Sequence, residues 1–183
     1  MRIIGGTAKG HVIKAPKGLD TRPTLDRVRE SVFNVLANRG IFGSDVLDIF
    51  SGTGAVAIEA LSRGAAHAVA VDFKTGKLIL ENAKHCRVDD RLEIIPRKLS
   101  QLKNYIVGRQ FDYIFSDPSY ENGFIQDTID LVVNHDLLKS EGILLLEHHK
   151  DEVFTLPESW ECMKEQKFGY TMVSYFVKIA ERS

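Results

Sequence analysis

The chain has 183 residues, of which 44% are hydrophobic and 27% charged, and its net charge is −1; these values suit one globular domain with a sizeable core. No apolar run approaches the roughly 18 residues of a membrane span, and the opening MRIIGGTAKG lacks the apolar region of a signal peptide. Cys86 and Cys162 are isolated and have no metal-binding spacing, so we expect two buried thiols. These features predict a cytoplasmic protein that is not associated with a membrane.

The charge is unevenly distributed along the chain. Residues 1–39 hold eight Lys and Arg against three Asp and Glu, whereas the remainder holds 16 against 22. A basic arm followed by an acidic body indicates that a polyanion binds near the N-terminus. A solvated charged face would give the same counts, and this alternative stays open.

The first 40 residues are predicted to form a small extension. Two short β-like pieces, residues 2–4 and 11–14, precede a helix for which Thr24 is the expected N-cap after Pro23. Asp26 suits the positive first turn of that helix, and Gly40 can end it. We therefore expect a basic extension, residues 1–40, packed on a main domain, residues 41–183.

From residue 45 onward, apolar runs suited to buried strands alternate with helical stretches. Five strands with helices between them predict an α/β fold with a mostly parallel, doubly wound sheet. Two final apolar runs flank Gly169-Tyr170 without a helix and predict an antiparallel hairpin. The expected strands are 46–50, 68–71, 92–95, 113–116 and 143–146, the helices 56–63, 74–85, 100–107 and 125–134, and the hairpin strands 161–168 and 172–179.

A glycine loop follows the first strand of this predicted sheet. Gly52-Thr53-Gly54 leads into a helix whose free N–H groups lie at the carboxyl edge, where such sheets bind ligands. Asp72 ends the second strand, at the spacing where an acid bonds ribose hydroxyls. The loop also fits the dinucleotide fingerprint, but Asp48 would face a pyrophosphate unfavourably. A carboxylate there suits the ammonium and sulfonium charges of S-adenosylmethionine (SAM).

The fourth strand ends in the turn Asp117-Pro118-Ser119-Tyr120. An amine on a nucleobase is a poor nucleophile because its lone pair is delocalised into the ring. The Asp117 carboxylate and the Pro118 carbonyl could accept hydrogen bonds from the two amine hydrogens, which favours the geometry in which the nitrogen attacks. Tyr120 could stack on an extruded base. The alternative is a plain Asp-Pro turn with Tyr120 as a half-buried anchor.

Several segments together resemble the RsmD family, the bacterial 16S ribosomal RNA guanine-N2 methyltransferases of class I. They run nearly end to end, and TRPTLDRVRES is the most specific because generic methyltransferases lack it. The resemblance implies a Rossmann-like seven-stranded sheet, SAM as the methyl donor without a metal, and one guanosine of 16S rRNA or of the assembling 30S subunit as acceptor; a monomer is expected. The segments are MRIIGGTAKG, TRPTLDRVRESVFNVL, VLDIFSGTGAVAIEALSRGA, FDYIFSDPSY and FGYTMVSYF.

The resemblance also implies roles for individual residues. Asp117, Pro118 and Tyr120 match the catalytic turn, and the basic extension matches an RNA-docking element with salt-sensitive phosphate contacts. The cofactor-binding residues are Asp48, Ser51, Gly52 and Gly54 for the methionine part of SAM and Asp72 for its ribose. The expected RNA-binding residues are Arg2, Lys9, Lys14, Arg22, Thr24 and Arg27.

Two positions depart from the family pattern. Ser119 stands where the family has a second proline, which removes a fixed φ angle and adds an N–H group. Ser100 stands after the third strand, where the family has an acid near the adenine. We therefore expect the Ser100 hydroxyl or a backbone N–H to contact the adenine.

Other functions are compatible with parts of this pattern. The same turn could serve another planar amine, such as adenine N6 of a nucleic acid or a protein amide. A non-catalytic rRNA-binding assembly factor could keep the fold and lose turnover through Ser119, and an NAD-dependent enzyme is a third alternative. His148 and His149 would point to opposite faces of their strand, which argues against a metal site. Glu147, at the end of the fifth strand, could approach the site or could be a solvated acid.

Overall fold

A computed structural model describes residues 1–17, 23–119 and 123–181, apart from the side chains of Pro23 and Thr24. Arg22 and Tyr120, which the sequence places in the site, therefore lie outside the described residues. No helix in the part of the chain that the structure describes is long and apolar enough to cross a membrane.

Seven strands form one sheet in the order β3-β2-β1-β4-β5-β7-β6. The pairs from β3 to β5 are parallel, whereas β7 runs antiparallel to both of its neighbours. This arrangement confirms the predicted doubly wound sheet with a terminal hairpin. The strands are β1 (Asp45–Ile49), β2 (His67–Val71), β3 (Leu92–Ile95), β4 (Phe111–Ser116), β5 (Leu138–His149), β6 (Trp160–Phe168) and β7 (Thr171–Lys178).

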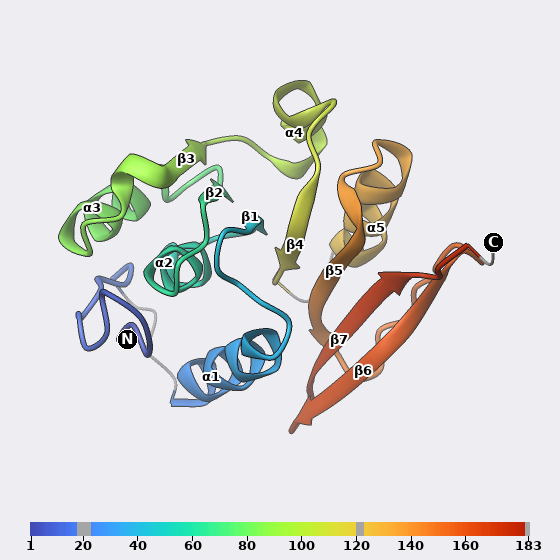
Figure 1. Ribbon diagram of the computed structural model, residues 1–183, viewed down its shortest axis with the longest axis horizontal. Coiled ribbons are helices and arrows are strands. Elements are labelled where there is room, and N and C mark those ends of the chain that lie inside the picture. The colour runs from blue at the N-terminus through green and yellow to red at the C-terminus, as the bar shows by residue number, and fades with distance from the viewer. Residues whose placement is uncertain (18–22, 120–122, 182–183) are drawn as a thin grey trace.

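Helices cover both faces of the sheet, as Figure 1 shows. One face packs against α1, α2, α3 and the N-terminal extension, and the other packs against α4 and α5. Buried strands face a different helix layer with each successive residue, because side chains alternate along a strand. The helices are α1 (Pro23–Ala37), α2 (Ala55–Ser62), α3 (Gly76–His85), α4 (Leu99–Ile106) and α5 (Phe124–Asn134), with one short 3₁₀ turn, η1 (Asp89–Arg91).

The extension is held to the main domain by Glu59, a fully buried carboxylate on α2. Its two oxygens accept hydrogen bonds from the backbone N–H groups of Ile4 and Gly5 at 2.8 to 3.2 Å and from Arg63 Nε at 2.9 Å. Arg29 Nε of α1 lies 3.4 Å from Glu59 Oε2. A buried charge is tolerated when cations and N–H groups surround it in this way. Glu59 therefore links the first residues of the chain, α1 and α2.

A second contact joins the extension to the C-terminal end of α2. Ser62 Oγ donates to the Gly5 carbonyl at 2.6 Å and accepts from the Ala8 N–H at 2.8 Å. Gly6 has a φ of 77°, and a Cβ added there would lie 1.8 Å from the Ser62 carbonyl oxygen. Only glycine fits so close an approach. Ile3, Ala8 and Ile13 belong to the same core as α1 and α2, so the extension shares the core of the main domain.

Several local expectations are corrected by the structure. The helix α1 begins at Pro23, so Thr24 lies inside it and is not its N-cap; proline suits the first helical position because its φ is already helical. Strand β1 ends at Ile49, and Phe50 follows in the left-handed region with a φ of 61°. Cys86 is buried as expected, but Cys162 is exposed. Cys162 lies on β6, which forms the edge of the sheet.

Candidate functional site

The glycine loop between β1 and α2 is closed around the carboxylate of Asp48. Asp48 is buried, and its Oδ2 accepts hydrogen bonds from Ser51 Oγ at 2.6 Å and from the Ala57 N–H at 3.2 Å. Gly52 and Gly54 have φ angles of 59° and 83°, which glycine adopts without strain. Asp48 Oδ1 has no hydrogen-bond partner among the described residues, so it is available to a ligand.

The backbone enters this loop under strain. Phe50 has a positive φ, a conformation that costs a bulky residue on the order of 1–3 kcal/mol. Its ring packs against Phe124 at the start of α5, with the ring centroids 5.3 Å apart. The strained turn directs the chain from β1 into the two glycines, and such strain is often found at ligand-binding loops.

Burial makes the Asp48 carboxylate costly to ionise. Desolvation raises the pKa of Asp48 to about 7, although the hydrogen bonds from Ser51 and Ala57 lower it, and the charges of Asp117 and Asp72 raise it further. A cation bound at Asp48 would offset both the desolvation and the repulsion. The loop therefore suits a ligand that carries a positive charge.

Asp72 is engaged by the backbone of two loops. Its Oδ2 accepts from the Gly52 N–H at 3.1 Å, and its Oδ1 accepts from the N–H groups of Lys74 and Thr75 at 2.9 and 3.1 Å. A carboxylate has about four acceptor positions, so one remains on Oδ2. Asp72 can bond one ligand hydroxyl while it also holds the glycine loop against the end of β2.

Replacing Asp72 by alanine is expected to weaken SAM binding by about 1–3 kcal/mol, because a charge-assisted hydrogen bond is lost and the Gly52 N–H loses its partner. Calorimetric titration with SAM measures the change. The matched control is Glu93→Ala, which removes an exposed carboxylate on β3 that pairs with Arg109 and should leave the affinity unchanged. An unaltered dissociation constant for the Asp72 variant would remove this residue from the site.

Asp117 and Pro118 directly follow β4, which pairs with β1. The register Ile49↔Ser116 places Asp117 beside the start of the glycine loop. Pro118 is buried, whereas Asp117 and Ser119 are exposed to solvent. The proposed acceptor turn and the glycine loop are therefore neighbours at one edge of the sheet.

Three carboxylates lie close together at this edge. Asp48 in β1 and Glu147 in β5 face α1 and α2, as do Val46 and Leu145 two residues before them. Asp117, directly after β4, is near enough to interact with the charges of both. The strands β1, β4 and β5 are adjacent, with Ser116 opposite Leu146. Glu147, which the sequence left undecided between the site and solvent, therefore lies next to Asp117.

The Asp117 and Glu147 carboxylates repel each other. Asp117 is open to solvent on one side, but the protein behind it and the Glu147 charge raise its pKa well above the usual range. Burial raises the pKa of the half-buried Glu147 to about 7. Neither carboxylate has a hydrogen bond or an ion pair with another described residue. A ligand that supplies hydrogen-bond donors or a positive charge would therefore stabilise both carboxylates in their ionised form.

Ser100 lies in the first turn of α4, at the carboxyl end of β3, and is exposed. A feature that sequence reasoning missed lies close to it. The exposed ring of Phe73, next to Asp72, has Lys74 Nζ 5.0 Å and Lys98 Nζ 5.5 Å from its centroid. Phe73 directly follows the predicted ribose acid, and this position could have drawn attention to it.

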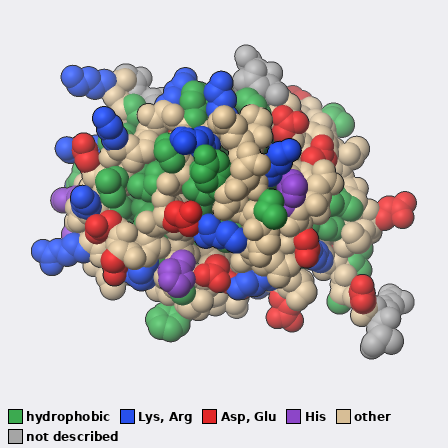
Figure 2. Space-filling model, turned by 90° about the horizontal axis from the view of Figure 1, so that it is seen from above, with side chains coloured by type: hydrophobic (Ala, Val, Ile, Leu, Met, Phe, Trp, Pro, Cys, Tyr) green, Lys and Arg blue, Asp and Glu red, His purple; other side chains and the backbone are tan. Residues whose placement is uncertain are grey.

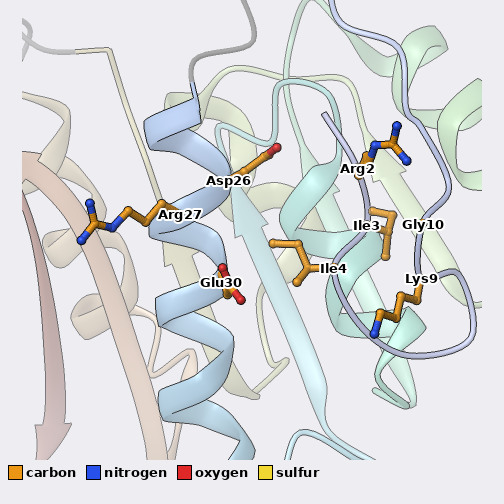
Figure 3. A pocket seen from close by; sticks show the side chains of 8 residues that line it. All are labelled: Arg2, Ile3, Ile4, Lys9, Gly10, Asp26, Arg27 and Glu30. Carbon is orange, nitrogen blue, oxygen red and sulfur yellow. The ribbon is translucent and has the colours of Figure 1, made fainter.

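The predicted RNA-binding residues are dispersed around the extension. Arg2, Lys9 and Arg27 line a hollow of about 460 Å³ between the first ten residues and α1, together with Asp26 and Glu30. Figure 3 shows that Arg27 points to the opposite side of α1 from Arg2 and Lys9. Basic and acidic side chains are interspersed on the face seen in Figure 2.

Two of the basic residues in the extension are already paired. Lys14 lies 3.4 Å from Glu81, although both side chains are exposed. Arg29 is buried, where it pairs with Glu59 and Asp26 and donates to the Arg2 carbonyl. Arg29 therefore contributes to the basic excess of the sequence but is not presented to a polyanion.

The histidine pair His148-His149 stands at the end of β5. His148 is buried and bonds Ser174 Oγ at 2.8 Å and the His149 carbonyl at 2.9 Å. Across residues 1–17, 23–119 and 123–181, no group of three or more His, Cys, Asp or Glu is arranged to hold a metal ion.

Comparisons with known proteins identify related chains. The family model described as conserved hypothetical protein 95 matches residues 1–177. The chain is 32% identical to a putative rRNA methyltransferase of Bacillus subtilis, YlbH, over 97% of this chain and 99% of that one. It is 30% identical to ribosomal RNA small subunit methyltransferase D of Escherichia coli, over 99% and 91%.

A solved structure shows the same fold. The putative methyltransferase yhhF of Escherichia coli superposes with a TM-score of 0.87 at 30% identity, over 99% of both chains. The predicted resemblance, the Rossmann-like fold and the assignment as a methyltransferase are thereby confirmed. The chain belongs to the conserved hypothetical protein 95 family, the RsmD-like methyltransferases.

Proposed function

We propose that this protein transfers a methyl group from SAM to N2 of one guanosine in small-subunit ribosomal RNA. The observation that carries the proposal is the placement of the Asp117-Pro118 turn beside the Asp48 glycine loop, in a chain whose relatives are named ribosomal RNA methyltransferases. The N-terminal segment, residues 1–40, then serves to dock the RNA on the catalytic part, residues 41–183.

The donor side of the site fits SAM. Asp48, with Ser51, Gly52 and Gly54, would hold the positively charged methionine part, because Oδ1 of Asp48 is unoccupied by other described residues and its pKa is raised by desolvation. Asp72 would bond the ribose, and Ser100 would lie near the adenine. SAM supplies a methyl group on a sulfonium centre, an electrophile that requires no metal.

On the acceptor side, the Asp117 carboxylate and the Pro118 carbonyl would accept hydrogen bonds from the two N2–H groups of a guanine turned out of its stack. The N2 lone pair then forms the bond to the methyl carbon as the carbon–sulfur bond breaks, which leaves a neutral thioether. The surplus proton on N2 passes to solvent. Tyr120 would stack on the base, and the Asp117 charge would stabilise the positive charge that develops on nitrogen.

On the RNA side, the extension would contact phosphates through Arg2, Lys9, Lys14, Arg22, Thr24 and Arg27. Met1 lies close to the glycine loop, since Thr53 Oγ1 is 3.5 Å from the Met1 sulfur. Asn82 of α3 donates to the carbonyls of both Lys14 and Thr53, at 3.0 and 2.9 Å. Phosphates bound by the extension would thus lie next to the donor loop.

Replacing Lys9 and Arg27 together by alanine is expected to weaken RNA binding and to flatten its salt dependence. Each lost phosphate contact lowers the slope of log K against log salt by about 0.7–0.9. Binding of a 16S rRNA fragment measured at several salt concentrations gives this slope. The control is Lys164→Ala with Lys167→Ala on the edge strand β6, which should leave the slope unchanged. An equal slope in the Lys9/Arg27 variant would exclude these two residues from RNA binding.

The function itself is tested by tritiated-methyl transfer from SAM to 30S particles that lack the modification, followed by nucleoside mapping. The proposal requires label in N2-methylguanosine at one position. Label in N6-methyladenosine or in protein would identify the alternative acceptors. Binding to the particles without label would indicate an assembly factor.

A further inference from the structure

We propose that the Glu147 carboxylate accepts a hydrogen bond from N1–H of the target guanine. This contact would select guanine over other bases that carry an amino group. The inference rests on the proposed function, because it assigns a third acceptor to the base held at the Asp117-Pro118 turn. Glu147 would be a specificity residue that touches the substrate.

The fold places Glu147 where this contact is possible. Ser116 and Leu146 are paired in the register of β4 and β5, so the next residues along the two parallel strands, Asp117 and Glu147, lie side by side. The Glu147 side chain points to the face covered by α1 and α2, as does Leu145 before it, and Asp117 lies close enough for the Glu147 charge to act on its carboxyl. A base whose N2 is bonded to Asp117 would therefore present its neighbouring atoms to Glu147.

Among the hydrogen-bond donors of guanine, one N–H group remains for Glu147 to bind. The edge of guanine that carries N2 has three N–H bonds, two on N2 and one on N1. The Asp117 carboxylate and the Pro118 carbonyl account for the two on N2, and N1–H still needs an acceptor once the base leaves its pair. Glu147 is half-buried and has no hydrogen bond or ion pair with the other described residues.

The same contact discriminates against adenine. Adenine carries an amino group next to N1, but N1 is then a lone pair and would face the Glu147 carboxylate, which offers no proton when ionised. A site built to accept from a substrate N–H rejects an analogue that lacks it, because the buried acceptor remains unpaired. The contact would thus separate guanine from the other planar amines that an Asp-Pro turn could serve.

The charges around Glu147 are consistent with its binding a donor. The charged group shown to interact with Glu147 at this edge is Asp117, directly after β4, and it is also acidic. The described residues supply no cation to offset the Glu147 charge. Burial raises the pKa of Glu147 to about 7, and an N–H donor from the base would favour its ionised form.

The decisive experiment compares guanosine with 2-aminopurine riboside at the mapped target position, in 16S rRNA assembled into particles. 2-Aminopurine keeps the N2 amino group but has a lone pair at N1 and lacks O6. We expect the wild-type protein to methylate it at least about 100-fold more slowly than guanosine. In Glu147→Gln, the rate on guanosine should fall about 10- to 100-fold, and the preference for guanosine should shrink to within about tenfold, because the amide can donate to N1.

The change in preference between variant and wild type isolates N1, because the missing O6 affects both proteins alike. Glu141→Gln, an exposed acid on the same strand, is the matched control and should keep the wild-type preference. Thermal melting and SAM titration of Glu147→Gln should match the wild type. A lower rate with an undiminished preference would overturn the proposal, as would an unchanged rate.

These outcomes separate the inference from the function on which it rests. If the wild-type protein labels no guanosine in the 30S assay, the proposed function fails. If it labels guanosine and Glu147→Gln keeps the full preference over 2-aminopurine, only the role of Glu147 fails. If Glu147→Gln does not fold, the wild-type ratio can still overturn the proposal, because a wild-type protein that methylates 2-aminopurine as fast as guanosine has no N1–H acceptor.

Discussion

Replacement of Asp117 by alanine is expected to reduce methyl transfer by about 10²–10³-fold and to leave SAM affinity nearly unchanged. The carboxylate would act on the acceptor base, where it orients N2 and stabilises the charge that develops on it. It lies at the end of β4 and forms no hydrogen bond with the described part of the glycine loop that would hold SAM. Single-turnover transfer to 30S particles measures the first effect, and calorimetry measures the second.

Ser119→Pro is the matched control for Asp117→Ala, since it changes the same turn without touching the two proposed acceptors. It restores a fixed φ, which is worth about 0.4–1 kcal/mol where the backbone is compatible, so its transfer rate should equal or exceed that of the wild type. Loss of SAM binding in Asp117→Ala would instead move Asp117 to the donor side. A collapse of activity in Ser119→Pro would show that the serine has a role of its own.

Asp48→Asn is expected to stabilise the SAM-free protein at pH 8 by up to about 4 kcal/mol, and to weaken SAM binding. Desolvation raises the pKa of Asp48 from 3.8 to about 7, and a tenfold change in its acid dissociation constant corresponds to about 1.4 kcal/mol. A carboxyl whose folded pKa is raised stabilises the fold when protonated, below its unfolded pKa. That contribution disappears as the pH rises through about 7. A neutral amide avoids the penalty at high pH.

Urea unfolding between pH 8 and pH 4 tests this expectation. The stability difference between Asp48→Asn and the wild type should shrink steadily as the pH falls, because the wild-type carboxyl becomes protonated. Glu141→Gln, an exposed acid, should show no such trend. A variant that is no more stable than the wild type at pH 8 would show that the hydrogen bonds from Ser51 and Ala57 outweigh the desolvation of Asp48. The protein would then tolerate this carboxylate at no cost.

The order of strands and helices was predictable because each element has a clear local pattern. Apolar runs such as 113–116 and 143–146 are too long and too apolar for exposed loops, and Gly169 marks the terminal hairpin. Local pattern was less informative where long-range packing decides. Strand β5 extends back to Leu138, through the polar residues 139–141, because its first residue pairs with Phe111 across a register shift.

In the candidate site, too, some features were recognisable in the sequence and others only in the structure. Asp48, Gly52, Gly54, Asp72 and the Asp117 turn stand out in the sequence because acids, glycines and proline directly follow predicted strands. Their assignment as ligand-binding and catalytic residues stays a prediction. The structure adds that Asp72 also holds the loop through Gly52, and that Phe50 enters it with a positive φ. Arg22 and Tyr120 lie outside the described residues.

By itself, the sequence determined the α/β fold, the methyltransferase family and the edge of the sheet at which the chemistry is expected. The fold and this edge follow from patterns between neighbouring residues, which local physics imposes. The family was indicated by the resemblance of segments such as TRPTLDRVRES. Only the tertiary structure decided that Glu147 lies beside Asp117 and that Glu59 binds the extension to α1 and α2. Strand order and side-chain direction bring these residues together from segments that are distant in the sequence. Such contacts cannot be predicted from the local sequence pattern of either segment.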